Sequence, residues 1–160
     1  DGGAHFYGTY ETADGKHVSI GSMEPQFYAL LMEKTGLDSD PDFKAQMDRN
    51  EWPQLRAKLA AVMVTKTRDE WDAIMYGTDI CYAPVLNFEE ATANKHNQDR
   101  ATFVEQDGIT QAAPAPRFSR TEPQLPPSAV AAGQQTDEIL GSLGLSDETI
   151  AALKGSGAIA

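Results

Sequence analysis

The feature of this sequence that most limits its possible folds is a dense group of prolines between residues 114 and 127. Proline has no backbone N–H and a fixed φ, so a segment this rich in proline forms neither a helix nor a central strand. Residues 113–132 are therefore predicted to form an extended strap. The strap separates a predicted small domain, residues 1–112, from a C-terminal tail, residues 133–160.

The small domain is predicted to contain two β-hairpins. Residues 6–12 are rich in aromatic and β-branched side chains, and the Asp14-Gly15 dipeptide that follows is a common turn sequence. Residues 17–22 alternate between apolar and polar, which indicates a strand with one buried face. Residues 101–112 are predicted to form the second hairpin, with its turn at Asp107-Gly108.

Several helices are predicted between and after these strands. The first begins at Pro25, ends before Gly36, and places Phe27, Leu30 and Leu31 on one side. Further elements are predicted as a helix from near Trp52 to Thr65, a helix opened by the capping box at residues 67–70, a strand from Ile80 to Leu86, and a short helix after Asn87. Short antiparallel strands combined with several helices predict the α+β class.

The tail is predicted to hold two short helices, opened by Thr136 and Ser146. Their apolar side chains are Ile139, Leu140, Leu143, Ile150 and Leu153. Two short helices that follow a strap cannot bury such side chains by themselves. We therefore expect the tail to dock on another body.

Charge and cysteine content limit the partners and the compartment. The chain has 24 acidic and 13 basic residues, a formal charge of −11, which argues against nucleic acid and anionic membranes as partners. No apolar run approaches the ~20 residues of a membrane span. The single cysteine, Cys81, is interpreted as a small buried side chain in a reducing, cytoplasmic compartment. Its spacing from the three histidines does not indicate a metal site.

Several segments of the sequence resemble the α-methylacyl-CoA racemases. The most specific is Gly21-Ser22-Met23-Glu24-Pro25-Gln26-Phe27-Tyr28. The others are residues 1–7, 9–16, 77–81, 83–86 and 113–121, and residues 133–145 are similar to the ending shared across the wider family III CoA-transferases. The resemblance therefore covers nearly the whole chain.

The resemblance implies a longer parent protein. Family members are about twice this length, so we expect the chain, which starts at Asp1 without an initiator Met, to be a C-terminal fragment. The missing part would be an N-terminal Rossmann-like large domain on which the tail docks, and two chains would interlock into a homodimer. The implied substrate is a 2-methylacyl-CoA thioester of fatty acid metabolism, with CoA as part of the substrate and no separate cofactor.

The resemblance also assigns candidate site residues. Glu24 would be a proton-transfer base, acting with a histidine of the large domain, and Tyr7 and Met23 would line the acyl pocket. From the residues alone, the favoured interpretation of Glu24 is a carboxylate that interacts with a helix N-terminus, and Tyr7 and Met23 can be ordinary packing residues. The family motif shifts the interpretation of Glu24 to a functional one. His5 stands where the family tends to have proline, and it is interpreted, like His96, as a solvated or loop histidine.

Three functions stay open from the sequence. The first is 1,1-proton transfer at the α-carbon of an acyl-CoA, an isomerase activity that we do not expect from the 160 residues alone. The second is CoA transfer between carboxylic acids, and the third is a non-catalytic folding or dimerisation module. Arg117 and Arg120 are candidates either for binding CoA phosphates or for anchoring the strap.

Overall fold

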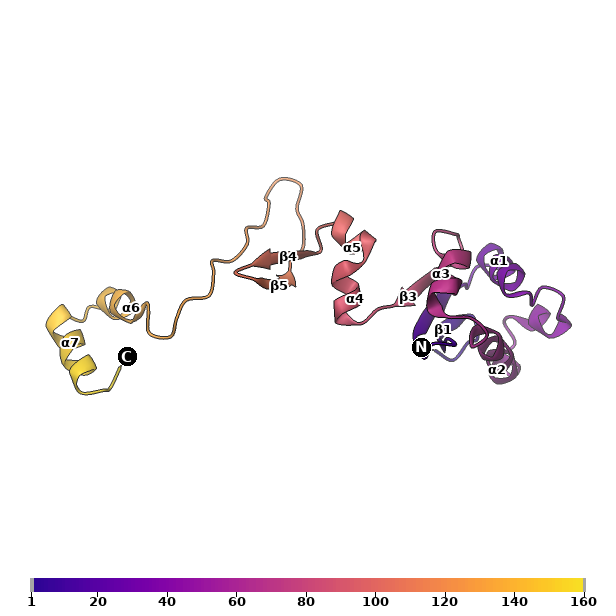
Figure 1. Cartoon of the computed structure of the whole chain (residues 1–160), viewed down its shortest axis with the longest axis horizontal. Helices are drawn as coiled ribbons and strands as arrows, with labels where there is room; N and C mark the ends of the chain where they lie inside the picture. The colour runs from indigo at the N-terminus through magenta and orange to yellow at the C-terminus, as the bar shows by residue number, and fades with distance from the viewer. Residues whose placement is uncertain (1, 160) are drawn as a thin grey trace. The chain divides into compact units, whose positions relative to one another are not determined.

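The computed structural model describes residues 2–159 (Figure 1). The chain forms two compact units, residues 1–91 and residues 92–160. Strands and helices are both present in each unit, so the predicted α+β class is confirmed. The division into a small domain (residues 1–112), a strap (113–132) and a tail (133–160) stays a prediction.

The first unit is built on a three-stranded antiparallel sheet. Strand β1 (Tyr7–Glu11) pairs with β2 (His17–Gly21), and β2 pairs with β3 (Tyr82–Val85), in the order β1-β2-β3. The predicted first hairpin is therefore confirmed. Its turn is closed by a hydrogen bond from the Thr12 amide to the Lys16 carbonyl, 2.9 Å long.

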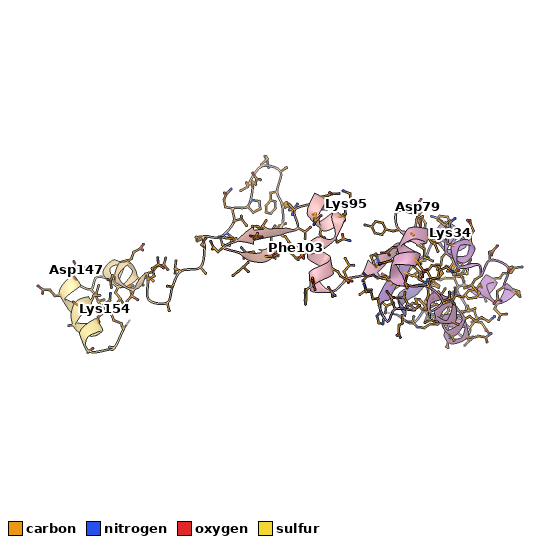
Figure 2. The ribbon with its side chains drawn as sticks, viewed as in Figure 1. Lys34, Asp79, Lys95, Phe103, Asp147 and Lys154 are labelled. Carbon is orange, nitrogen blue, oxygen red and sulfur yellow. The ribbon has the colours of Figure 1, made fainter. Side chains whose placement is uncertain are left out.

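Helices pack against this sheet. They are α1 (Pro25–Thr35), the 3-10 helix η1 (Pro41–Ala45), α2 (Trp52–Met63) and α3 (Arg68–Met75). Helix α2 contacts β1, and α3 contacts β3. The side chains of this unit fill the space between the sheet and the helices (Figure 2). The most deeply buried apolar ones are Val18, Ile20, Leu31, Leu55, Leu59, Met63, Trp71, Met75 and Ile80.

Helix α1 has the predicted ends but a different buried face. Pro25 occupies its first turn, and Gly36 follows its last residue in the left-handed conformation with φ 73°. The buried residues are Tyr28, Leu31 and Met32, whereas Phe27, predicted on the apolar side, is only half-buried. The buried Tyr28 hydroxyl has hydrogen-bond partners inside the unit, at His5 and the Phe43 carbonyl, so its burial leaves no unpaired polar group.

The strand predicted from Ile80 to Leu86 is shorter in the structure. Ile80 is buried but precedes the strand, and Cys81 adopts the left-handed conformation with φ 60°. Cys81 is exposed, so its interpretation as a buried side chain is wrong. The left-handed backbone at Cys81 interrupts the alternation that the sequence suggested, and regular pairing starts only at Tyr82.

The chain then continues through α4 (Phe88–Ala93) into the second unit. This unit contains α5 (Lys95–Asp99) and the hairpin of β4 (Phe103–Gln106) and β5 (Ile109–Ala112). Asp107 and Gly108 both have positive φ, 54° and 76°, as a type I′ turn requires, which confirms the predicted second hairpin. Residues 113–131 contain no helix or strand, in agreement with the predicted strap.

The tail forms the two predicted helices, α6 (Thr136–Ser142) and α7 (Asp147–Gly155). They contact each other, and Lys154 forms an ion pair with Asp137 at 2.7 Å. Ile150 is buried, contrary to the expectation that all apolar side chains of the tail lack cover. Ile139 and Leu143 are 53% and 70% exposed, and the docking of the tail on another domain stays a prediction.

Candidate functional site

The candidate residues meet at one end of the first hairpin. Tyr7 is the first residue of β1 and lies opposite Gly21, the last residue of β2. Met23 and Glu24 follow in the short connection to α1. Chain topology therefore brings Tyr7 near two residues that are more than fifteen positions away in the sequence.

The connection from β2 to α1 is held by neighbours on both sides. The Gly21 amide donates to the Cys81 carbonyl at 2.9 Å, and the Ser22 amide donates to the Phe6 carbonyl at 3.0 Å. The buried Ser22 hydroxyl donates to the Ile80 carbonyl. These bonds fix the backbone from which the side chains of Met23 and Glu24 project.

Glu24 occupies the N-cap position of α1. Its backbone is extended, with φ −70° and ψ 144°, and its side chain is exposed and makes no capping hydrogen bond. Its carbonyl accepts the Tyr28 amide at 2.9 Å, the first bond of the helix. A carboxylate here is favoured by the helix dipole, and its oxygens do not serve as a cap. The geometry thus presents a carboxylate to solvent from a fixed backbone.

Tyr7 and Met23 supply apolar surface at the same end of the hairpin. Their exposed fractions are 46% and 51%, which is high for side chains of this size. The Tyr7 ring lies beside Gly21, where a Cβ would be 3.6 Å from the ring carbon Cε2. The backbone of Met23 is held by the Gln46 side-chain amide, which donates to its carbonyl at 2.9 Å. The roles assigned to Tyr7 and Met23 stay predictions.

His5 is not solvated, and this part of its interpretation is wrong. Its side chain is fully buried, and Nε2 lies 2.8 Å from the Tyr28 hydroxyl. Burial lowers the pKa of His5 from 6.5 to about 4, because a charged imidazole would lose its water. The residue lies in the turn before β1, so its placement in a loop was correct. The partner at Tyr28 depends on how the hairpin and α1 pack, which local sequence does not specify.

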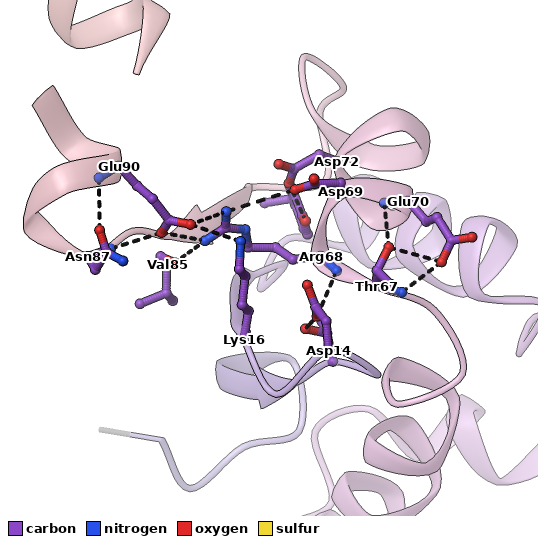
Figure 3. Close-up of polar contacts among 12 residues, drawn as sticks. Asp14, Lys16, Thr67, Arg68, Asp69, Glu70, Asp72, Val85, Asn87 and Glu90 are labelled. Carbon is purple, nitrogen blue, oxygen red and sulfur yellow. Dashed lines mark hydrogen bonds and ion pairs between the residues drawn. The ribbon is translucent and has the colours of Figure 1, made fainter. Parts of the chain in front are cut away.

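A partly buried ion pair supports the opposite end of the hairpin, near its turn (Figure 3). Arg68 makes two hydrogen bonds to the Glu90 carboxylate, 2.7 and 2.8 Å long, and donates to the Val85 carbonyl at 3.0 Å. Lys16 adds an ion pair to Glu90 at 2.9 Å. Arg68 and Lys16 hold the pKa of Glu90 well below its usual range. The sequence showed the capping pair of Asn87 and Glu90 but gave no signal for Arg68 as a partner.

The structure shows an anchoring contact for one of the two strap arginines. The Arg117 guanidinium donates to the backbone carbonyls of Arg100 and Ala101, the second at 2.6 Å. This favours the anchoring interpretation of Arg117 over phosphate binding.

The described part of the chain contains neither a cluster of metal ligands nor a membrane-spanning helix. Within residues 2–159, no group of three or more His, Cys, Asp and Glu side chains is arranged to hold a metal ion. Over the same residues, every helix is too short or too polar to cross a lipid bilayer.

Comparison with known proteins places the chain in a family. Residues 1–136 match the sequence model of CoA-transferase family III. The chain belongs to this family. It is 44% identical over 153 residues to the α-methylacyl-CoA racemase of Mus musculus and 43% identical over 160 residues to that of Homo sapiens. The resemblance seen in the sequence is therefore confirmed.

The family relatives are longer than this chain. Each racemase alignment covers 94% of the chain and 40% of the relative, so the chain spans about 40% of the length of the curated relatives it matches. A crystal structure of Rv3272 from M. tuberculosis superposes with a TM-score of 0.61 at 18% identity, covering 72% of this chain and 33% of that one. At such low identity, this match supports the fold alone.

Proposed function

We propose that the chain is part of an α-methylacyl-CoA racemase-like enzyme, to which it contributes a proton-transfer group, Glu24. The observation that carries the proposal is the exposed Glu24 carboxylate, which is held at a helix N-terminus without a capping role. The 43–44% identity to two racemases over nearly the whole chain supports the same assignment.

The chemistry explains why a positioned carboxylate is needed. The hydrogen on the carbon α to a thioester is only weakly acidic, so its removal needs a base and stabilisation of the enolate oxygen. Inversion then needs a second group on the opposite face to return the proton. Glu24 would serve one face, either as the base itself or by orienting a histidine of a large domain. Tyr7 and Met23 would contact the acyl chain.

The same assignment suggests the substrate, the missing domain, the oligomeric state and the compartment of the proposed enzyme. The substrate would be a 2-methyl-branched acyl-CoA, so the enzyme would act in lipid metabolism, and CoA would enter as part of the substrate. The second proton-transfer group would come from an N-terminal large domain, on which the exposed tail side chains of Ile139 and Leu143 would dock. We further propose an interlocked homodimer in the cytoplasm.

CoA transfer between carboxylic acids is the second candidate function. Membership of CoA-transferase family III favours it. In that reaction a carboxylate attacks the thioester, and no proton moves at the α-carbon. The two candidates are therefore distinguished by exchange of the α-hydrogen.

We predict that Glu24→Gln in the full-length enzyme lowers kcat for deuterium exchange at the α-carbon of 2-methylacyl-CoA in D2O. Glutamine keeps the size of the side chain but removes its basicity, so the loss should be about 10²–10⁴-fold if Glu24 is the base, and smaller if it orients a histidine. In either case KM should change little. Mass spectrometry of the recovered thioester measures the exchange.

Glu33→Gln is the matched control, because Glu33 is an exposed glutamate on the same helix whose ion pair with Lys34 lies at the surface. Its exchange rate should be normal. The 160-residue chain assayed alone should show only the buffer rate. Near-normal kcat in Glu24→Gln would return Glu24 to the interpretation of a helix-start carboxylate and contradict the proposal.

A further inference from the structure

We infer that His5 and Tyr28 are positioning residues for Glu24, because their buried hydrogen bond joins the turn before β1 to the first turn of α1. The inference rests on the proposed role of Glu24. It assigns a function to a polar contact in the core that substrate does not reach.

The direction of the hydrogen bonds can be assigned from their partners. The Tyr28 hydroxyl donates to the Phe43 carbonyl at 3.0 Å, and its single proton is thereby used. Its oxygen must then accept from His5, so Nε2 of His5 carries the proton across the 2.8 Å contact. Nδ1 of His5 is buried and has no hydrogen-bond partner among residues 2–159. The neutral ring with one donor nitrogen is therefore the form that fits this site.

Tyr28 is directly linked to Glu24. Its amide donates to the Glu24 carbonyl at 2.9 Å, one helical turn away. The side chain and the amide of Tyr28 thus connect the core to the N-cap of α1. The orientation of this turn therefore sets the position of the Glu24 Cα, from which its uncapped side chain projects.

The backbone around His5 is also held by hydrogen bonds. The Tyr10 hydroxyl donates to the His5 carbonyl, and the Tyr7 amide donates to the Ala4 carbonyl at 3.2 Å. The turn that holds His5 therefore leads into Tyr7, a predicted substrate contact. The contact between His5 and Tyr28 ties together the two segments that carry Tyr7 and Glu24.

The hydrogen bond between His5 and Tyr28 fixes the orientation of α1 more narrowly than apolar packing would. Apolar side chains in a core are attracted over a range of orientations, whereas an N–H···O contact weakens steeply away from a linear geometry. The bonds at the Tyr28 hydroxyl, one accepted from His5 and one donated to Phe43, thus restrict rotation of α1 about its axis. A small rotation of this helix would move the Glu24 carboxylate relative to a bound α-carbon.

The test is Tyr28→Phe in the full-length enzyme, which removes the hydroxyl and keeps the ring. We expect kcat for α-exchange to fall about 10–100-fold with KM little changed, since displacement of a catalytic group acts on the chemical step. Tyr82→Phe is the matched control. Its hydroxyl donates to Asp72 at 2.6 Å, which joins β3 to α3 in the same unit and makes no bond to α1, so kcat should stay normal.

Two further comparisons separate positioning from general loss of stability. In a Glu24→Gln background, Tyr28→Phe should cause no additional loss of kcat, because the group it positions is already absent. His5→Gln, whose amide can still donate to Tyr28, should retain more activity than His5→Leu. Thermal melts of each variant confirm that the compared proteins are folded, and the His5 pair decides the question if Tyr28→Phe does not fold.

The outcomes distinguish this inference from the proposed function. Normal kcat in Glu24→Gln would overturn the proposed function itself. A large loss in Glu24→Gln, with equal kcat in Tyr28→Phe and Tyr82→Phe, would overturn only the positioning role. Additive losses in the double variant would also overturn it, because Tyr28 would then act independently of Glu24.

Discussion

At the scale of single residues, the burial of His5 makes folding depend on pH. The unfolded chain takes up a proton at this imidazole below about pH 6.5, whereas the folded chain does so only below about pH 4. Between these values the unfolded state binds more protons, so stability falls as pH falls, and it is unaffected above pH 6.5. The total loss from this group is at most about 3 kcal/mol.

We predict that His5→Gln reduces this dependence. Urea unfolding at pH 7 and pH 4.5 should show a smaller drop in stability for the variant than for the parent chain, because glutamine does not titrate. The carboxylates that titrate at low pH are the same in both proteins and cancel in the comparison. Burial raises the pKa of the neighbouring Tyr10 to about 12, so that hydroxyl contributes nothing in this range. An equal drop in both proteins would contradict the prediction.

Residues whose environment is set by their sequence neighbours were predicted correctly. Residues whose environment is set by distant parts of the chain were not. Glu24 was placed at a helix start because Pro25 follows it, which is local information. His5 is surrounded by Tyr28 and Phe43, more than twenty positions away. Cys81 is exposed and has a left-handed backbone, although the apolar residues on either side of it in the sequence suggested a buried strand position. The burial of a single polar residue thus depends on tertiary packing, which the local sequence pattern does not specify.

At the scale of elements, local signals were sufficient for most ends and turns. The Thr67–Glu70 capping box forms as predicted, with the Thr67 amide donating to the Glu70 carboxylate at 2.8 Å. Both hairpins turn at their predicted dipeptides. The φ angle is positive at Gly15 in the first turn and at Asp107 and Gly108 in the second, a conformation that Gly and Asp adopt more readily than most residues. The buried face of α1 was less well predicted. Tyr28 and Phe27 are both aromatic, and the buried partners of Tyr28, His5 and Phe43, lie far from it in the sequence.

The ion pair of Arg68 and Glu90 shows how elements are joined beyond such local signals. Arg68 begins α3, and its guanidinium reaches the end of β3 and the first turn of α4. Its side chain is 7% exposed, so its charge depends on the Glu90 carboxylate for compensation. The Arg68 amide also donates to Asp14 in the hairpin turn at 3.2 Å. Several elements of the first unit therefore meet at one residue.

We predict that Glu90→Ala lowers the melting temperature of the chain by about 5–10 °C, because the buried Arg68 guanidinium loses both hydrogen bonds to Glu90 and keeps only the Asp69 carboxylate, 3.8 Å away. Glu33→Ala removes the surface pair with Lys34 and should shift the melting temperature by less than about 2 °C. Circular dichroism at pH 7 measures both. Equal shifts in the two variants would show that the Arg68 pair contributes no more than a surface contact.

At the scale of the whole molecule, the apolar core is unevenly distributed along the chain. Of the buried hydrophobic residues in the described part of the chain, all but Ile150 lie within residues 1–91. The large apolar side chains of the second unit are mostly exposed or half-buried, and the exposed ones include Ile109, Phe118, Ile139 and Leu143. An open apolar groove of about 630 Å³ borders α6 and includes Ile139, Leu140 and Val130. The two units should therefore differ strongly in local stability.

We predict that hydrogen exchange shows this difference directly in the 160-residue chain. Helices α6 and α7 have 7 and 9 residues, below the ~12–15 at which isolated helices become marginally stable in water. Their contact with each other buries Ile150 but leaves Ile139 and Leu143 in solvent, so it adds little protection. Amides of residues 136–155 should exchange within seconds at pH 7 in a dilute sample, while those of β2 and α2 remain protected. Protection of the tail that appears only at high concentration would mean that a second copy covers it. Strong protection in a dilute monomer would contradict the prediction, because the chain would then bury its own tail.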